Sequence, residues 1–528
     1  MDLFKKKVVL VEKKDEVLFH IDIEQRIPTL PDITDKEKFD VKYPLIAPYA
    51  YVHIYWDAPA KELVYSVEEP VLDDKEKKIL SILEDGIKEL INITFISVKE
   101  GDILIEFLEK NIKVLLNELS ITISKETFLK IMYYVYRDFV GLNEIEPLLW
   151  DYFIEDIECN GVKFPLYIVH RKYRNLRTNI QWNDIPKLAS FVEKLAQKCG
   201  KYVSYASPLL DGSLPDGSRV NATYTTDITS RGPTMTIRKF TKEPWSPTKL
   251  MQIRTVSPEI MAYLWILIEN ETNVMVIGGT GSGKTTLLNA LAFFVPPQAR
   301  IVSIEDTREL NLEHANWLPS VAREGVGLAN IIGQKYGEVS LFDLLKESFR
   351  QNPDYVIVGE VRGREAYVLF QGMASGHPSF GTMHADDVNT MIKRLETPPI
   401  NLSASLVEAM DCVCVMTAAR VKDQPVRKVR EVVEIVKVTE AGAVTNIPFY
   451  WDPRTDNFYL RTESHVFNKI STQTGVPKEE LYKEFRLRAQ LLTKLLQSNV
   501  ISYRDVQAII NDYYNSPEET LKKHGILK

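Results

Sequence analysis

The apolar residues in the second half of the chain gather in short runs with polar residues at their ends. Largely apolar runs lie at residues 274–277, 301–304 and 355–358, and residues 379–384 form a fourth segment of strand length. Runs this short predict strands that are buried on both faces of a sheet. Their separation along the chain suits an open parallel sheet, so this half is predicted to be an α/β domain.

The pattern before residue 240 is mixed. Residues 73–91 carry an apolar stripe at helical spacing that includes Ile79, Leu83 and Ile87, which predicts a helix. Further helices are predicted at 127–139 and 185–199, and strands at 8–11, 49–56 and 166–170. We therefore expect an α+β N-terminal domain ahead of the α/β domain.

Changes in composition divide the chain into five expected parts. These are a variable, partner-docking region at 1–115, an α+β lobe at 116–240, a hinge linker at 241–256, the core with the parallel-rich sheet at 257–430, and a mixed, then helical region at 431–528. Pro244 and Pro247 are predicted to exclude helix from the linker. A helix is predicted to begin after Ser257, which suits an N-cap and is followed by a proline.

Composition and charge narrow the class of protein. The chain has 528 residues and a formal net charge of −7; the length predicts two to four domains, and the acidic balance argues against a protein whose main task is to grip nucleic acid. No apolar run approaches the length of a membrane span, and the first residues do not resemble a secretory signal. The four cysteines form no C-x-x-C pair, which argues against a zinc knuckle or a disulfide framework. We expect a cytoplasmic protein.

The first apolar run leads into a phosphate-binding loop. Gly278 and Gly283 bracket a G-x-x-x-x-G-K-T motif that ends in Lys284 and Thr285. Glycines let backbone N–H groups point at phosphates, the lysine reaches the β- and γ-phosphates, and the threonine hydroxyl can bind Mg²⁺. The expected nucleotide-binding residues are Gly278, Gly279, Thr280, Gly281, Ser282, Gly283, Lys284, Thr285 and Thr286. The alternative, a glycine-rich turn with a chance lysine, does not explain the strand and helix on either side, so the sequence predicts ATP with Mg²⁺.

Acidic residues and a histidine follow the other three predicted strands. Glu305, Glu360 and His384 would meet the phosphate loop at one rim, because ligands of open parallel sheets sit beyond the carboxyl ends of the strands. Glu305 is a candidate for the base that orients the attacking water, Glu360 suits an acid that holds Mg²⁺, and His384 could contact the γ-phosphate. Each residue alone is a weak signal, since surface ion pairs would explain such residues as well. Their joint occurrence predicts an ATPase.

Three arginines precede the phosphate loop in a region rich in Gly, Asp, Ser and Thr. Arg219, Arg231 and Arg238 are candidates for neutralising phosphate charge in trans or from a neighbouring domain. A solvated surface with ordinary salt bridges explains them equally well, and spacing does not decide between the two.

These motifs together resemble the secretion and pilus ATPases of the type II/IV superfamily. The family's Asp box resembles residues 304–310, its Walker B region residues 350–366 and its His box residues 376–385, and the likeness covers residues 140–420. The tail, particularly residues 510–521, resembles the archaeal branch. The residues Lys346 to Phe349 depart from the more apolar helix of relatives, and the metal-binding cysteine module of bacterial members is missing.

The resemblance implies a homo-hexamer of two-lobed subunits, each with a RecA-like P-loop motor domain in its C-terminal lobe. It implies nucleotide in a cleft between lobes, lobe rotation on hydrolysis, and transmission to a polytopic platform protein of the cytoplasmic membrane that moves pilin-like subunits. It assigns the catalytic-glutamate role to Glu305, the Walker B role to Glu360 and a sensor role to His384, and makes Arg219, Arg231 and Arg238 arginine-finger candidates. Residues 398–402 resemble pilus-assembly or secretion members more than the archaellum motor.

Two readings of other classes stay open. One is a nucleotide-gated scaffold, in which ATP binding orders a hexamer with little turnover. The other is a conjugation-type DNA-traffic ATPase, which the acidic balance of the chain disfavours.

Overall fold

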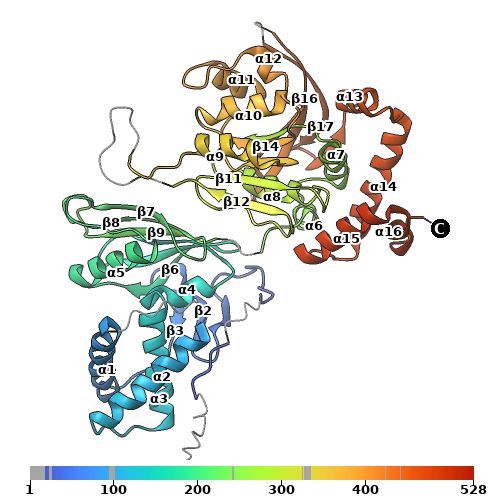
Figure 1. Ribbon diagram of the computed structural model, residues 1–528. Coiled ribbons are helices and arrows are strands. Elements are labelled where there is room, and N and C mark those ends of the chain that lie inside the picture. Colours follow the sequence, from blue (N-terminus) through green and yellow to red (C-terminus); the bar gives the residue numbers. More distant parts are fainter. Residues whose placement is uncertain are drawn as a thin grey trace, which may run out of the picture. The chain divides into compact units, whose positions relative to one another are not determined.

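The computed structural model describes residues 18–22, 27–93, 101–240, 243–323, 325, 335–422, 424–439 and 442–527. The strand expected at 8–11 lies outside these residues. The chain forms two compact units, Met1–Phe240 and Thr241–Lys528 (Figure 1), and each is described by itself. The expected border at residue 115 falls inside a helix of the first unit, and the one at residue 430 falls inside a strand of the second.

The first unit combines one long sheet with helices. Its strands are β1 (Asp40–Ile46), β2 (Ala50–Asp57), β3 (Glu62–Glu68), β4 (Ile154–Cys159), β5 (Pro165–His170), β6 (Arg174–Gln181), β7 (Leu209–Ser213), β8 (Arg219–Thr223) and β9 (Thr234–Arg238). Its α-helices are α1 (Asp74–Ile93), α2 (Gly101–Glu118), α3 (Lys125–Val135), α4 (Glu146–Trp150) and α5 (Ile185–Lys198). A π-helix, Tyr136–Val140, and a 3₁₀ turn, Asn143–Ile145, join α3 to α4.

The sheet of the first unit joins residues that are far apart in the sequence. Its order is β1-β2-β3-β6-β5-β4-β9-β8-β7, so the strands that precede α1 continue, through the parallel pair β3 and β6, into those that follow α4. One hydrophobic cluster packs α5 against this sheet, and a second lies among α1, α2 and α3. This arrangement explains why residues before and after position 115 share one unit.

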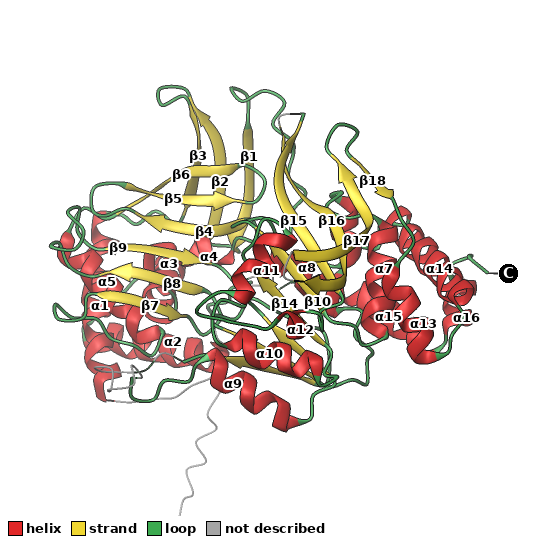
Figure 2. Cartoon of the chain, turned by 90° about the horizontal axis from the view of Figure 1, so that it is seen from above, coloured by secondary structure: helices red, strands yellow, loops and turns green. Residues whose placement is uncertain are grey.

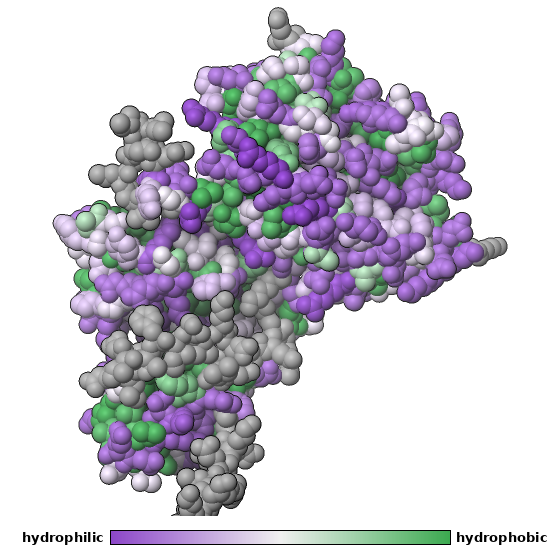
Figure 3. Space-filling view, in the orientation of Figure 1, coloured by the Kyte–Doolittle hydropathy of each residue, from purple (hydrophilic) through white to green (hydrophobic). Residues whose placement is uncertain are grey.

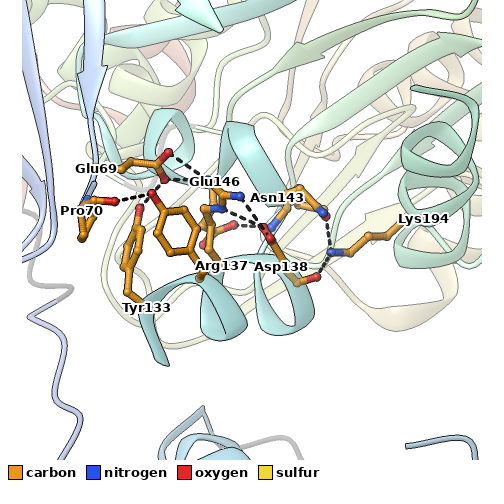
Figure 4. A network of polar contacts seen from close by, with 10 residues as sticks. Glu69, Pro70, Tyr133, Arg137, Asp138, Asn143, Glu146 and Lys194 are labelled. Atoms are coloured by element: carbon orange, nitrogen blue, oxygen red, sulfur yellow. Dashed lines mark hydrogen bonds and ion pairs between the residues drawn. The ribbon is translucent and has the colours of Figure 1, made fainter. Parts of the chain in front are cut away.

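A polar network joins residues that follow β3, α3 and the π-helix to α5 (Figure 4). Arg137, in the π-helix, is buried and pairs with Glu69 at 2.9 Å and with Asp138 at 2.7 Å. Lys194 of α5 donates hydrogen bonds to the backbone carbonyl of Asp138 and to Asn143 Oδ1, at 2.7 and 2.6 Å. The buried charge of Arg137 is thus fully engaged, and the network ties α5 to the residues that follow α3.

The second unit contains the predicted α/β domain. Its strands are β10 (Val274–Gly278), β11 (Ile301–Glu305), β12 (Trp317–Val321), β13 (Tyr355–Val358), β14 (Ser379–Met383), β15 (Cys412–Val421), β16 (Gln424–Thr439), β17 (Gly442–Asp452) and β18 (Asn457–Leu460). Its helices are α6 (Pro247–Gln252), α7 (Pro258–Glu269), α8 (Lys284–Ala292), α9 (Leu341–Ser348), α10 (Glu365–Ala374), α11 (Val388–Glu396), α12 (Ala404–Val407), α13 (His465–Thr474), α14 (Lys478–Gln497), α15 (Tyr503–Asn515) and α16 (Pro517–Lys523).

The strands from β12 to β15 are parallel, in the order β12-β11-β13-β14-β10-β15, and β16 to β18 continue the sheet antiparallel. Both faces are covered: Val274 and Val276 of β10 belong to one hydrophobic cluster, while Met275 and Ile277 belong to the other. Alternate residues of a strand point to opposite faces, so the apolar runs predicted as doubly buried strands are confirmed. The unit is therefore an α/β domain with a parallel-rich sheet, as the sequence predicts, and it agrees with the RecA-like fold that the resemblance implies.

The C-terminal helices cover the α7 side of this domain. Every residue of α7 from Ile260 to Ile268 is buried, and α13 to α16 gather beside it in both views (Figures 1 and 2). Leu491 and Leu492 of α14 and Tyr513 of α15 belong to the same hydrophobic cluster as α7. The tail is therefore part of the packing of this unit.

The expectation that Pro247 excludes helix is wrong. Pro247 is the first residue of α6, and the Ser246 hydroxyl caps this helix by accepting from the N–H of Lys249 at 3.1 Å. A proline at the first helical position lacks only an N–H that would have no partner within the helix. The helix start predicted after Ser257 is confirmed, since its hydroxyl accepts from the N–H of Ile260.

The surface on the face shown in Figure 3 is largely hydrophilic with scattered apolar residues. In the part of the chain that the structure describes, no helix has both the length and the apolar character needed to cross a membrane.

Candidate functional site: a phosphate-binding loop at the rim of the sheet

The phosphate loop connects the end of β10 to the start of α8. Gly278 has φ of +155°, and a Cβ at this position would lie 2.5 Å from the backbone oxygen of Met416 on β15. Gly283, with φ of +95°, caps the N-terminus of α8 in the left-handed region. A Cβ has no room at Gly278, and the left-handed φ of Gly283 strains any other residue, so glycines allow this backbone to curve over the end of the strand.

Lys284 is buried in the first turn of α8 and points back across the loop. Its Nζ donates to the backbone oxygen of Gly279 at 3.0 Å and lies 3.3 Å from His384 Nδ1. Burial lowers the pKa of Lys284 from its ordinary value, although Glu360 and Glu309 act to raise it. The loop carbonyl and the histidine thus hold the ammonium group where a phosphate would meet it.

Glu305 ends β11 in a buried position, with 2% of its surface exposed. Its Oε1 accepts from the backbone N–H groups of Glu309 and Leu310, each at 2.9 Å, whereas the buried Oε2 has no hydrogen-bond partner within the described residues. Burial raises the pKa of Glu305 to about 7. A carboxylate with one oriented, unsatisfied oxygen and a pKa near neutrality suits a general base.

Glu360 follows β13 and is engaged on both carboxylate oxygens. Its Oε1 lies 3.3 Å from His384 Nε2, and its Oε2 accepts from Arg362 Nη2. Burial acts to raise the pKa of Glu360, but the Arg362 hydrogen bond and the charges of Arg362, His384 and Lys284 hold it below its ordinary value. Glu360 therefore stays ionised, as a metal-binding carboxylate must.

The rim thus brings together Lys284, His384 and Glu360, from three neighbouring strand ends, in one continuous chain of contacts. Glu305 stands at the end of the next strand, because β11 pairs with β13. Its Cγ lies only 2.9 Å from where a Cβ of Gly359 would be, so the glycine before Glu360 makes room for Glu305.

The three candidate arginines all belong to the first unit. Arg219 and Arg238 face each other on β8 and β9, and they pair with Asp211 at 3.0 Å and with Asp156 at 3.1 Å. The guanidinium of Arg231 lies 4.3 Å from the ring centroid of Phe164. Within this unit the arginines make ordinary ion pairs and a ring contact, and their catalytic role stays a prediction.

The residues of the rim fit a magnesium nucleotide. The loop is a cradle that a Cβ at Gly278 would fill, and it leads into the N-terminus of a nine-residue helix, where backbone N–H groups favour phosphate oxygens. Thr285, in the first turn of that helix, and Glu360 supply the hydroxyl and carboxylate oxygens that Mg²⁺ prefers. Such a partial oxygen set suits Mg²⁺, which keeps waters and phosphate oxygens as its other ligands. No cluster of three or more metal-ligating side chains is present in the described residues.

Sequence reasoning missed the residues that shape the loop after β13. Glu365, at the start of α10, accepts from the N–H groups of Arg362 and Gly363, each at 2.6 Å. The Thr382 hydroxyl donates to the backbone oxygen of Gly359 at 2.6 Å. Glu365 is the first residue of α10, and an acid at the start of a helix was the available signal.

Comparison with known proteins identifies the class. The model of the type II/IV secretion system protein family matches residues 167–448, and that of the PilB3-like C-terminal family matches residues 454–525. The chain belongs to the type II/IV secretion system protein family.

Particular relatives span archaea and bacteria. An uncharacterized protein of Methanocaldococcus jannaschii is 35% identical over 94% of this chain and 94% of its own length. The type IV secretion system protein PtlH of Bordetella pertussis is 31% identical over 38% of this chain and 64% of its own length. Among solved structures, the VirB11 ATPase of the Brucella suis type IV secretion system matches with 24% identity and a TM-score of 0.28, over 55% of this chain and 93% of that one.

Proposed function

We propose that this chain hydrolyses ATP and uses the energy as the motor of a secretion or pilus-assembly machine. The observation that carries the proposal is the rim of the second unit, where the chain of contacts from Lys284 through His384 to Glu360 lies beside the buried Glu305. Phosphoryl transfer requires positioned cations, a metal-binding carboxylate and a group that orients water, and the rim has a residue for each.

Each residue has a defined task in this proposal. Lys284 neutralises phosphate charge, Thr285 and Glu360 hold the metal, and Glu305 orients the attacking water and accepts its proton. Mg-ATP, when bound, would supply the phosphate bond that is hydrolysed and, through the metal, positive charge beside the phosphates. His384, in contact with Lys284 and Glu360, links the phosphate site to β14.

The experiment measures ATP turnover by the purified full-length chain. Lys284→Ala is expected to abolish nucleotide binding and turnover, because the phosphates lose their main cation. Glu305→Gln is expected to keep binding but lower turnover at least about a hundredfold, the usual loss for a general base. Unchanged hydrolysis in both variants would exclude the proposal, and binding without turnover in the wild type would favour a nucleotide-gated scaffold.

The finer proposal concerns the machine. The membership of the family and the extent of the match to an archaeal relative support an archaeal pilus-assembly or type II-like secretion motor, with the archaellum motor as the alternative. It would act as a homo-hexamer at the cytoplasmic face of the membrane, on a polytopic platform protein and, through it, on pilin-like subunits. Co-purification from the native membrane, followed by identification of the bound chains, tests this proposal. Recovery with an archaellum membrane protein would replace the pilus assignment.

A further inference from the structure

Arg362 connects the ends of two strands at the rim. Its side chain, 58% exposed, donates from Nη2 to Glu360 Oε2, while Nη1 lies 3.5 Å from Asp306 Oδ2. Glu360 follows β13 and Asp306 follows β11. A guanidinium offers several N–H donors in one plane, so Arg362 makes a hydrogen bond to Glu360 and a longer ion pair with Asp306 from one position.

The backbone that carries Arg362 is fixed from two sides. Glu365 accepts from the N–H groups of Arg362 and Gly363, and the N–H of Val361 donates to the backbone oxygen of Thr382 at 2.8 Å. None of these contacts involves the guanidinium. The side chain can therefore move from one carboxylate to the other without movement of the loop.

The position of Arg362 conflicts with metal binding at Glu360. Both carboxylate oxygens of Glu360 face Arg362 and His384, so a divalent cation held by Glu360 would have to share these oxygens with them. Two cations on one carboxylate repel each other, and Glu360 is mostly buried, with 20% of its side chain exposed. The ion pair between Arg362 and Glu360 is therefore screened less by solvent and salt than a fully exposed ion pair.

We propose that Arg362 competes with Mg²⁺ for Glu360: it neutralises this carboxylate in the free protein and shifts to Asp306 when a magnesium nucleotide binds. The proposal rests on the proposed nucleotide site. It makes Arg362 a positioning residue that sets how much Mg²⁺ the site requires, and it links occupation of the site to the segment that follows β11.

The proposal and a purely structural role predict opposite effects of removing Arg362. Without its competitor, Glu360 should bind the metal more readily, so Arg362→Gln should lower the Mg²⁺ concentration for half-maximal nucleotide binding by roughly three- to tenfold, the range for one charged pair of this exposure. If Arg362 only holds Glu360 in place, the same variant should raise that concentration.

The test is a titration with Mg²⁺ at a fixed, subsaturating concentration of a fluorescent ADP analogue, followed by fluorescence, on the full-length chain. Arg364→Gln is the matched control, because Arg364 is an exposed residue of the same loop that stands two positions further on. It removes the same charge without removing the contact to Glu360. Arg362→Lys keeps a cation near Glu360 but loses the planar set of donors, so its Mg²⁺ requirement should lie between those of the wild type and Arg362→Gln.

The expected result is a lowered Mg²⁺ requirement in Arg362→Gln and no comparable change in Arg364→Gln. An unchanged or raised requirement in Arg362→Gln, or an equal shift in both variants, would overturn the proposal. A wild-type chain that binds no nucleotide at any Mg²⁺ concentration would instead contradict the proposed function itself. Thermal melting of each variant verifies that the fold is intact, and a fall in melting temperature confined to Arg362→Gln would indicate the structural role.

Discussion

Glu305 and Glu360 are carboxylates at neighbouring strand ends whose surroundings drive their protonation apart. Glu305 is buried, and burial raises its pKa to about 7, although two backbone hydrogen bonds and the charge of Arg308 act to lower it. Glu360 has Arg362 and His384 in contact, and these charges outweigh its burial and hold its pKa below the ordinary value. Two acids with diverging pKa values are the usual sign of divided roles, which supports the proposal that Glu305 is the base and Glu360 the metal ligand.

This division predicts a pH dependence of turnover. Glu305 must be ionised to accept a proton, so kcat/KM for ATP should fall about tenfold per pH unit below about 7, since kcat/KM reports the free enzyme. Binding of a non-hydrolysable ATP analogue at pH 6 and pH 8 serves as the control. A rate profile that is flat from pH 5.5 to 8, with turnover intact, would remove Glu305 from the role of base.

The same pKa predicts a pH dependence of stability. Unfolded, the carboxyl of Glu305 ionises near 4.5; folded, it ionises near 7, so the folded chain holds an extra proton between these values. Stability from this group is therefore present below pH 4.5 and lost as pH rises to 7. Glutamine does not titrate, so Glu305→Gln lacks this pH dependence. From pH 5 to 7.5 the unfolding free energy of the wild type should therefore fall by about 2–3 kcal/mol relative to that of Glu305→Gln. Denaturant unfolding at several pH values measures it, and a constant difference would contradict the assignment.

Helix α7 illustrates how one element depends on distant parts of the chain. Arg488 of α14 is buried, pairs with Glu269 and Glu484, and lies 4.7 Å from the ring centroid of Trp265 in α7. Tyr514 of α15 accepts from the indole N–H of Trp265 at 2.9 Å. These contacts cover the side of α7 that carries Trp265, and every residue from Ile260 to Ile268 is buried, which is why this helix can be apolar all round.

Removal of Arg488 should accordingly destabilise the second unit. Arg488→Ala is expected to lower the unfolding free energy by about 2–3 kcal/mol, because Trp265 loses its cover and two acids lose their partner. The acids are about one third exposed and can be rehydrated, so Arg488→Met, which restores the volume, should lose only about 1 kcal/mol. Arg504→Ala, at an exposed residue of α15, is the control and should change the value by less than about 0.5 kcal/mol. Equal losses of unfolding free energy in all three variants would show that the buried contacts of Arg488 contribute no more to stability than an exposed arginine does.

Prediction from sequence succeeded where the signal was local. The strands β10, β11 and β13 were found because each is a short apolar run buried on both faces, and β14 was found as a segment of strand length. The pairing of β3 with β6 could not be found, since it joins residues on either side of helices α1 to α4. The contact of Arg362 with Glu360 was missed for a different reason, since a two-residue spacing is also typical of a surface ion pair. Only the structure shows that His384, which follows the neighbouring strand β14, contacts the same carboxylate.

At the scale of the whole molecule, the chain consists of two units with separate cores. Each hydrophobic cluster of the described residues lies entirely within one unit. The phosphate loop and the carboxylates of the rim belong to the second unit, whereas Arg219, Arg231 and Arg238 belong to the first. The residues proposed to bind the nucleotide and the arginine predicted to contribute to catalysis therefore belong to different units.

This separation leads to a prediction for residues 243–528 expressed alone. The fragment should fold and bind a fluorescent ADP analogue with affinity within about threefold of the full chain, because its cores and phosphate loop are complete. Its ATP turnover should be lower by about a thousandfold, the smaller end of the effect of an arginine finger. In the full chain, one of Arg219→Ala, Arg231→Ala and Arg238→Ala should reproduce this loss while the other two retain turnover. Full turnover by the fragment would remove all three arginines from catalysis and leave them with the ion pairs and ring contact of the first unit.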